Sequence, residues 1–408
     1  MSKLQELIDK LCPNGVEYLN LGDVCEFKRG KALSSKNVIK GSVPVMAGGQ
    51  KPSCYHNTPN RSGETIVVAG SGAYAGFVTY WKIPIFVSDA FSVHPNDRLL
   101  TKYVFYYLKN FQEKIHATKK GAGVPHVHGS DIAKFSIPVP PIEVQEEIVR
   151  ILDSFSDYAA ELQAELQARK QQYEYYRNLL LTFNPSAYGC GTDDEQKDGV
   201  TTWGGHNYKI EWKKMGEIGT FIRGNGLQKK DFTESGVGCI HYGQIYTHYG
   251  TFATKTKSFV SEKLASKLLK IENGDIVLAC TSENIEDVAK AVAWLGKETI
   301  VTGGHSVVFK HTANPKYIAY FMQTALFFNQ KKRYAYGAKV IDIKTEDLAK
   351  ILIPIPPLEL QEKIVAILDR FETLVNDLTN GLPAEIAAVK DQYEYYRNKL
   401  LTFKKLSA

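Results

Sequence analysis

The glycine-rich stretch AGSGAYAG at residues 69–76 is the segment of this chain that comes nearest to a catalytic motif. Glycines at this spacing can bring backbone N–H groups to a phosphate when a strand precedes them and a helix follows. Here the chain continues as FVTYW over residues 77–81, a run that favours a strand. We therefore interpret the stretch as a tight loop whose backbone can approach a phosphate or a base.

Other motifs of catalysis are incomplete. Asn184-Pro185-Ser186-Ala187-Tyr188 is similar to the Asn-Pro-Pro-Tyr element of adenine methyltransferases, but no glycine-rich cofactor strand precedes it. His126 and His128 lack the further ligands that a zinc site needs. The six cysteines show neither metal-ligand nor redox spacing, and the chain contains no Gly-x4-Gly-Lys-Ser/Thr phosphate loop. We expect no cofactor, no metal and no catalytic residue.

The composition of the 408 residues is that of a globular protein, with 44% hydrophobic and 23% charged residues. No apolar run reaches the length of a membrane span, and residues 1–10 are amphipathic and unlike a signal peptide. We expect a cytoplasmic protein that does not associate with membranes. The net charge of +6 permits nucleic-acid binding without requiring it, because a local basic patch matters more than the sum.

A direct internal repeat determines the organisation of the chain. The sequence IPVPPIEVQEEIVRILDSF at residues 137–155 returns as IPIPPLELQEKIVAILDRF at residues 353–371. Likewise, KQQYEYYRNLLLTF at residues 170–183 returns as KDQYEYYRNKLLTF at residues 390–403. Each half is thus a variable globular region followed by a nearly invariant segment. We interpret this as one structural plan used twice, with two different globular regions that would recognise two different targets.

The invariant segments have the apolar spacing of coiled-coil helices. In the first, apolar residues recur at steps of four and three over residues 148–183. The second keeps this spacing over residues 364–382 and needs four extra residues before it resumes. Gly381 and Pro383 lie in this insertion, so we predict a kink or an interruption of the helix there.

The globular regions combine predicted strands, at residues 62–68 and 273–278, with predicted helices at residues 103–116 and 315–330. Residues 186–205 are rich in Gly, Asp, Thr and Lys and have no periodicity, which is typical of a flexible linker. We therefore expect a first globular domain at 1–140, a first coiled-coil helix at 141–183, a linker at 184–205, a second globular domain at 206–356 and a second coiled-coil helix at 357–408.

A duplicated chain of this kind resembles the specificity (S) subunit of type I restriction-modification systems. The resemblance covers the whole chain and rests on the order of its motifs. These are the two IP[VI]PP-x-E-x-Q-E-x-IV-x-ILD helix starts, the two QYEYYRN helix ends, the GDIVLACTS strand at residues 274–282 and the tandem AELQ repeat at residues 160–167.

The resemblance implies an α+β fold class: two mixed α/β target-recognition domains joined by two long antiparallel coiled-coil helices in a pseudo-two-fold internal repeat. It also implies a non-catalytic subunit, each domain of which reads one half of a split site on double-stranded DNA. The helices would set the spacer and dock two methyltransferase (M) subunits, with restriction (R) subunits joining through the complex. The four-residue difference between the helices makes the symmetry imperfect here.

Lys and Arg neutralise phosphates, whereas Gln, Asn, His and Arg can present paired groups to base edges, so these residue types are candidates for DNA contact. Arg29 and Arg223 occupy equivalent places in the two repeats, as do Gln50 and Gln244. A basic run is about as often a solvated surface, and this recurrence favours DNA contact. The predicted set is Lys28, Arg29, Lys31, Gln50, Lys51, Ser71, Tyr74, Lys119 and Lys120 in the first domain, and Arg223, Lys229, His241, Tyr242, Gln244, Thr281, Ser282, Lys331, Lys332 and Arg333 in the second.

The aromatic helix ends divide into two groups. Tyr173, Tyr176, Tyr393 and Tyr396 lie on the coiled-coil seam and are expected to pack there. Tyrosine and arginine beside the seam suit a protein interface, although ordinary surface placement is nearly as good an explanation. We predict that partner subunits bind at Tyr175, Arg177, Tyr395 and Arg397.

Two other classes of function stay open on the sequence alone. A self-contained DNA methyltransferase or nuclease would show activity in the isolated chain, but its cofactor, metal and phosphate motifs are missing. A repeat scaffold that binds only proteins would show no salt-sensitive association with DNA.

Overall fold

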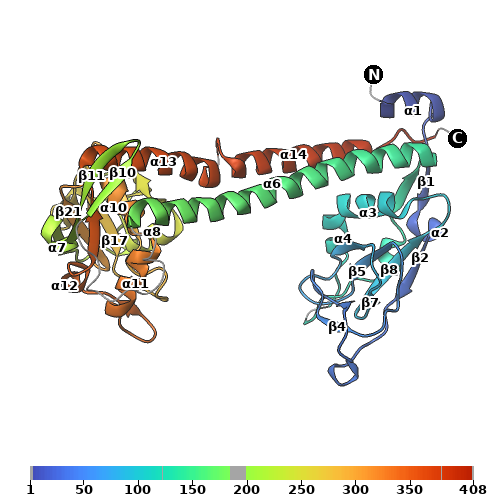
Figure 1. Ribbon diagram of the computed structural model, residues 1–408. Helices are drawn as coiled ribbons and strands as arrows, with labels where there is room; N and C mark the ends of the chain where they lie inside the picture. Colours follow the sequence, from blue (N-terminus) through green and yellow to red (C-terminus); the bar gives the residue numbers. More distant parts are fainter. Residues whose placement is uncertain (1–2, 122, 184–198, 378, 407–408) are drawn as a thin grey trace. The chain divides into compact units, whose positions relative to one another are not determined.

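The computed structural model describes residues 3–121, 123–183, 199–377 and 379–406 (Figure 1). The chain divides into two compact units. Unit 1 comprises Met1–Ala164 and Ala384–Ala408, and unit 2 comprises Glu165–Pro383. Each unit therefore combines one globular domain with helical segments from both repeats.

Unit 1 is built on a four-stranded antiparallel sheet in the order β2-β8-β5-β6. All five residues of β5, TIVVA, are buried, as its run of β-branched residues favours. A smaller sheet has the order β4-β3-β7. The elements of the domain are α1 (Lys3–Leu11), β1 (Glu17–Asn20), α2 (Leu21–Val24), β2 (Cys25–Arg29), η1 (Ser35–Asn37), β3 (Val43–Met46), β4 (Cys54–His56), β5 (Thr65–Ala69), β6 (Val78–Trp81), β7 (Phe86–Val87), β8 (Ala90–Pro95), α3 (Thr101–Asn110), α4 (Gln112–Ala117), α5 (Gly129–Ile132) and β9 (Ser136–Val139).

Unit 2 repeats this plan. In its sheet of order β12-β21-β17-β19-β14, the first four strands follow the order of the unit 1 sheet, and β17 is again buried throughout. A second sheet has the order β15-β13-β20-β16. The elements are β10 (Gly199–Trp203), β11 (His206–Lys214), α7 (Met215–Ile218), β12 (Gly219–Arg223), η3 (Lys229–Asp231), β13 (Val237–Ile240), α8 (Tyr242–Thr247), β14 (Phe252–Ala253), β15 (Ser258–Val260), α9 (Glu262–Ala265), β16 (Leu269–Ile271), β17 (Ile276–Ala279), β18 (Thr281–Ser282), β19 (Ala291–Trp294), β20 (Ile300–Thr302), β21 (Ser306–His311), α10 (Pro315–Phe321), α11 (Ala325–Tyr334), β22 (Ile341–Asp342), α12 (Thr345–Leu348) and β23 (Leu352–Ile355).

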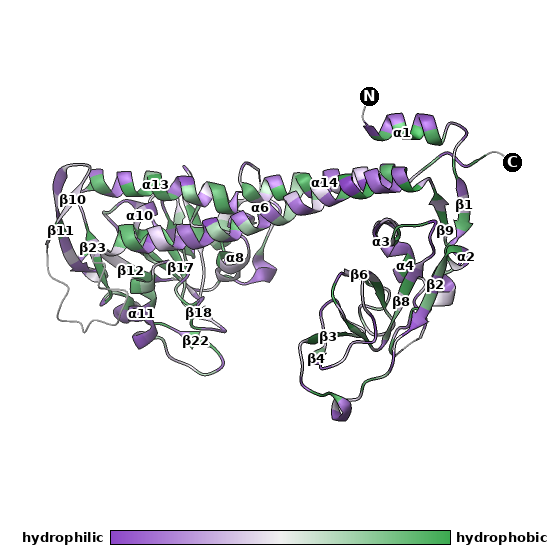
Figure 2. Ribbon diagram, turned by 45° about the vertical axis from the view of Figure 1, so that its right-hand side comes forward, coloured by the Kyte–Doolittle hydropathy of each residue, from purple (hydrophilic) through white to green (hydrophobic). Residues whose placement is uncertain are grey.

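The long helices are α6 (Ile142–Thr182), α13 (Leu358–Asn376) and α14 (Leu382–Leu400), which carry hydrophobic and hydrophilic residues in alternation (Figure 2). The predicted interruption near Gly381 is confirmed. The Asp377 carboxylate accepts hydrogen bonds from Thr379 N and Oγ1, at 2.7 and 2.6 Å, which ends α13. Pro383 lies in the first turn of α14, where its missing N–H costs nothing.

Within each unit, segments of the two repeats pair through aromatic rings. In unit 1, Phe155 of α6 stacks on Tyr396 of α14 with 5.5 Å between ring centroids, and Tyr158 donates to Glu385 at 2.6 Å. In unit 2, Phe371 of α13 stacks on Tyr176 of α6 at 5.7 Å. The α+β fold with an internal repeat is therefore confirmed.

Three local predictions are corrected. Residues 184–198 lie outside the described residues, but β10 occupies the end of the expected linker and pairs with β11, because its Val200, Thr201 and Thr202 favour a strand. The helix expected at 103–116 is divided at Phe111, whose φ of −97° and ψ of 13° leave the helical region. The helix expected at 315–330 is divided because Thr324 caps a new one.

No helix in the described part of the chain has the length and apolar character that crossing a membrane requires.

Candidate nucleic-acid interface

Equivalent backbone hydrogen bonds bring three loops together in each unit. Gly30 N donates to Ala90 O at 2.8 Å in unit 1, and Gly224 N donates to Ser306 O at 2.9 Å in unit 2. In unit 1, Gly70, which follows β5, donates its N–H to Asp89 O and accepts a hydrogen bond from Val127 N. In unit 2, Cys280, which follows β17, donates its N–H to His305 O and accepts a hydrogen bond from Ile343 N. The backbone framework is therefore shared, whereas the side chains at these positions differ.

In unit 1 the loops enclose a pocket of about 230 Å³. Its polar lining comes from Arg29, Asp89, His126, His128 and Ser130. The Asp89 carboxylate accepts a hydrogen bond from Ser71 Oγ, and the two histidine rings stack with 6.5 Å between centroids. A guanidinium and a carboxylate in one pocket can present both donors and acceptors to a base edge.

In unit 2 a hollow of about 410 Å³ lies beside the equivalent loops. The Tyr242 ring lies 4.4 Å from the His241 ring and 5.1 Å from the His305 ring. Burial lowers the pKa of His241, which favours the neutral ring. Tyr242 and His305 line the hollow together with mostly polar residues: Tyr246, Thr281, Ser282, Glu283, Asn284, Asp287 and Val340. This mixture of aromatic and hydrogen-bonding groups suits nucleobases better than a row of phosphates.

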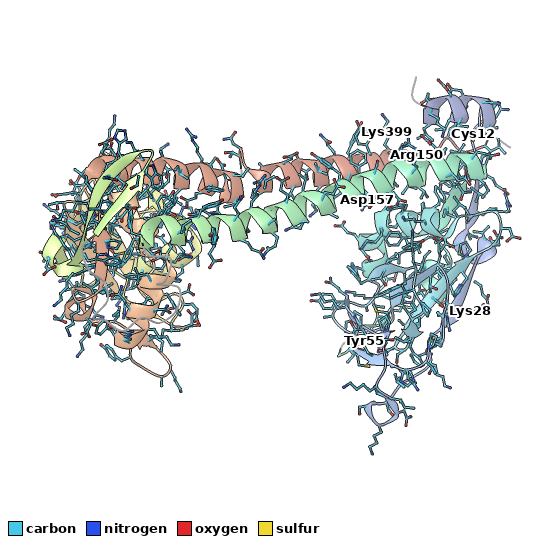
Figure 3. The ribbon with its side chains drawn as sticks, viewed as in Figure 1. Cys12, Lys28, Tyr55, Arg150, Asp157 and Lys399 are labelled. Carbon is cyan, nitrogen blue, oxygen red and sulfur yellow. The ribbon has the colours of Figure 1, made fainter. Side chains whose placement is uncertain are left out.

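Most of the basic side chains predicted for unit 1 are at its surface, as Figure 3 illustrates for Lys28. Several are already paired: Lys28 with Glu26 at 2.8 Å, Lys120 with Asp131 at 2.7 Å, and Lys119 with the carbonyl oxygen of Ala73 at 3.0 Å. Ser71 is buried against Asp89. The exposed members of the set are Lys28, Arg29, Lys31, Gln50, Lys51, Tyr74 and Lys120.

The cluster predicted at Lys331, Lys332 and Arg333 is divided by the fold. Lys332 and Arg333 are exposed, but Lys331 is 4% exposed and its Nζ donates to Glu286 O and Val288 O at 2.8 and 2.6 Å. The inclusion of Lys331 among DNA-contacting residues is therefore wrong, because this side chain does not reach the surface.

Other predicted residues of unit 2 serve partly internal roles. Gln244 accepts from His241 N and donates to Ser258 Oγ, and Thr281 and His241 are buried. Gln50 and Gln244 follow corresponding strands, β3 and β13. Gln50 is exposed, whereas Gln244 is half-buried and hydrogen-bonded within the unit. Arg223 is paired with Asp342 at 2.9 Å, Lys229 is exposed, and Tyr242 and Ser282 line the hollow.

A hairpin in each unit was missed from the sequence. Antiparallel bridges join Lys120 to His126 and Tyr336 to Asp342. The first residue inside each is a glycine with positive φ, Gly121 at 105° and Gly337 at 113°. Exposed valines follow: Val124 is 56% exposed and Val340 is 59% exposed. The Gly-Ala pair that both repeats carry, at residues 121–122 and 337–338, was the sequence signal for these hairpins. Only strand pairing brings His126 and Asp342 to the loops.

The predicted partner residues divide in the same way in both units. Tyr175 and Tyr395 are 57% and 61% exposed. Arg177 instead donates to Gln323 at 3.1 Å and Arg397 donates to Asn110 at 3.2 Å, so each arginine fastens a helix end to a domain. Both arginines are half-buried and also make contacts within their units, and their binding of partner subunits stays a prediction.

Among the described residues, no group of three or more His, Cys, Asp or Glu side chains could hold a metal ion.

The two units together define a duplicated recognition protein, in which one backbone framework displays two different sets of side chains. A family model described as "Type I restriction modification DNA specificity domain" matches residues 13–169 and 208–388. The chain belongs to this family of type I restriction-modification specificity proteins.

Individual relatives agree with this assignment. The chain is 27% identical over 442 residues to the Escherichia coli "Type I restriction enzyme EcoR124I/EcoR124II specificity subunit", a match covering 99% of this chain and 98% of the relative. It is 27% identical over 433 residues to a putative type I restriction enzyme specificity subunit of Haemophilus influenzae, covering 99% and 100%. The fold is similar to that of the type I restriction-modification S subunit from M. genitalium, with a TM-score of 0.55, 17% identity and coverage of 95% and 96%.

Proposed function

We propose that this chain is the DNA-specificity subunit of a type I restriction-modification enzyme, and that each unit reads one half of a bipartite site on double-stranded DNA. The observation that carries the proposal is the shared loop framework with different side chains. Gly70, Asp89 and His126 in unit 1 stand where Cys280, His305 and Asp342 stand in unit 2. Two domains with the same loop geometry but different side chains suit two different half-sites.

Affinity and specificity would come from different residues. Exposed cations neutralise phosphates and release counterions, which holds the duplex without selecting its sequence. Polar and aromatic groups around the pocket and the hollow are placed to select bases. We assign phosphate contact to Lys28, Lys31, Lys51, Lys120, Lys229, Lys332 and Arg333. We assign base selection to the polar residues that line the unit 1 pocket, Arg29 among them, and the unit 2 hollow.

The helices would position the two readers and hold the rest of the enzyme. Two methyltransferase subunits are proposed to dock on the helix ends around Tyr175 and Tyr395, which have equivalent places and similar exposure. Restriction subunits would join through this complex. In this arrangement the chain itself transfers no methyl group and cuts no DNA.

The proposal is tested by methylome sequencing of a host that expresses the complete system and has no other DNA methylation. A single bipartite motif with an unread spacer is expected. The isolated full-length chain should bind a 30-base-pair duplex in a salt-dependent way and should show no heat of S-adenosylmethionine binding in calorimetry. Stoichiometric binding of that cofactor would favour a self-contained methyltransferase, and absence of DNA binding would favour a protein scaffold.

A further inference from the structure

The loop that leaves the central strand has the same closure in both units. Gly76 N donates to Ala69 O at 2.7 Å, and Ala289 N donates to Ala279 O at 2.8 Å. Both closing residues have positive φ, 84° for Gly76 and 62° for Ala289. An alanine in this region is strained, so the surrounding structure must hold the loop in place. These loops, residues 70–76 and 280–289, carry Tyr74 in unit 1 and Ser282, Asn284 and Asp287 in unit 2.

In unit 1 the loop is held from behind by helix α4 and the residues after it. Gln112 Nε2 donates to Gly76 O at 2.7 Å, and His116 Nδ1 lies 2.9 Å from Ala75 O. Lys119 Nζ donates to Ala73 O at 3.0 Å. Gln112 and His116 are one helical turn apart, so they share a face of α4. Three carbonyl groups of the loop, those of Ala73, Ala75 and Gly76, therefore accept hydrogen bonds from this helix and the residues after it.

In unit 2 one buried side chain does the same. Lys331 of α11 donates to Glu286 O and to Val288 O, and Val288 has the place that Ala75 has in unit 1, immediately before the closing residue. Burial lowers the pKa of Lys331 to about 8, while Asp287 and Glu286 oppose this shift. A buried cation is costly unless it is hydrogen-bonded, and here the ammonium group satisfies two backbone carbonyl oxygens of the loop. The lysine therefore ties α11 to residues 286–288 of the loop.

We propose that His116 and Lys331 are positioning residues for DNA recognition. Each holds in place the loop with which its unit reads a half-site, and neither touches DNA. The inference rests on the proposed function and extends it to residues behind the DNA-binding surface. Lys331 would govern which bases are accepted without contributing to phosphate binding.

The neighbouring residues Lys331 and Lys332 provide a matched test, because one points inward and the other is exposed. The full-length variants Lys331→Met and Lys332→Met are expressed with the partner subunits for methylome sequencing. The purified chains are titrated with a random-sequence 30-base-pair duplex at several salt concentrations. Amide hydrogen exchange over residues 280–289 reports on the loop.

For Lys331→Met we expect faster exchange of the loop, an unchanged salt slope and relaxed sequence choice in one half-site only. The preference for the correct bases there should fall about tenfold, the scale of one good base contact. For Lys332→Met we expect the salt slope to fall by about 0.9, since one phosphate contact is lost, with both half-sites unchanged. A Lys331→Met chain that loses salt slope, or that keeps full selectivity, overturns the proposal.

Unit 1 provides an independent test that does not depend on how well Lys331→Met folds. His116→Phe removes the bond to Ala75 O at similar volume, whereas His116→Gln can still donate to it. We expect relaxed reading of the other half-site for His116→Phe and restored selectivity for His116→Gln. Equal selectivity in both variants contradicts the inference. Failure of the proposed function is distinguishable, because the wild-type chain would then direct no bipartite methylation at all.

Discussion

Arg223 and Asp342 form an ion pair in unit 2, with 2.9 Å between a guanidinium nitrogen and a carboxylate oxygen. The arginine ends β12, and the aspartate ends β22 at the base of the hairpin. In unit 1 the equivalent residues are Arg29 and His126, which line one pocket. The arginine of unit 2 is thus held by a carboxylate that unit 1 lacks at this position.

Removing this carboxylate should strengthen DNA binding. Asp342→Asn leaves the side-chain shape but frees Arg223 for a phosphate, so the dissociation constant for a random-sequence duplex should fall several-fold and the salt slope should rise by about 0.9. Fluorescence anisotropy at several salt concentrations measures both. Asp347→Asn is the control, since it removes the same charge from the ion pair that Asp347 of α12 makes with Lys350. An equal effect of the two substitutions would mean that net charge alone is responsible.

The helix-end arginines and tyrosines should have separable effects. Arg177→Ala and Arg397→Ala each remove a hydrogen bond to a domain, to Gln323 and Asn110, and should lower the free energy of unfolding by about 1–2 kcal/mol. Tyr175→Ala and Tyr395→Ala should leave stability nearly unchanged and weaken assembly with the methyltransferase subunits. Urea unfolding and analytical ultracentrifugation give the two readouts. Loss of stability without loss of assembly in the tyrosine variants would contradict the docking proposal.

Acid should destabilise unit 1 through Glu147. Hydrogen bonds from Arg150 and Lys3 hold the pKa of this carboxyl at about 2, below its ordinary value of 4.5. The stabilisation is therefore complete above pH 4.5 and is lost as the pH falls toward 2. Because Lys3 and Arg150 are mostly exposed, about 2 kcal/mol is expected. Glu147→Gln should lose this stabilisation at pH 6, and its free energy of unfolding should change less between pH 4.5 and 2 than that of the wild type. Glu146→Gln should follow the wild type.

The AELQ repeat at residues 160–167 should act as a ruler. Four added helical residues extend α6 by roughly 6 Å and rotate it about 40° beyond a full turn. One base pair adds about 3.4 Å and roughly 35° of twist, so the rotations nearly match and tilt or DNA bending absorbs the remaining length. Insertion of a third AELQ unit should lengthen the unread spacer of the methylated motif and preserve both half-sites. An unchanged spacer, or altered half-site bases, would exclude a ruler.

The parts of the fold that the sequence predicted correctly are those set by local spacing and by repetition. The coiled-coil pattern identified α6, and Gly381 with Pro383 identified the interruption after α13. The arginines before Gly30 and Gly224 were paired because both repeats carry them. What the sequence could not predict depends on long-range packing. Nothing in the run Lys331-Lys332-Arg333 distinguishes an inward from an outward lysine until α11 is placed against residues 286–288.

The candidate site itself was only partly predictable for the same reason. Asp89, His126 and His305 come from segments that strand pairing brings to the loops, and no motif marks them. Phe111 and Thr324 divide helices whose apolar pattern continues through the break, so the amphipathic pattern alone predicted one helix in place of two.

Exchange of residues 20–135 for the equivalent segment of a relative with a different motif tests the central claim most directly. This segment contains the unit 1 loops and leaves α6, α13 and α14 untouched. Methylome sequencing of a host expressing the hybrid with its partner subunits is the measurement. The account predicts that one half of the methylated motif changes to that of the relative, while the other half and the spacer length stay the same. A change in both halves, or in neither, would contradict two independently reading units.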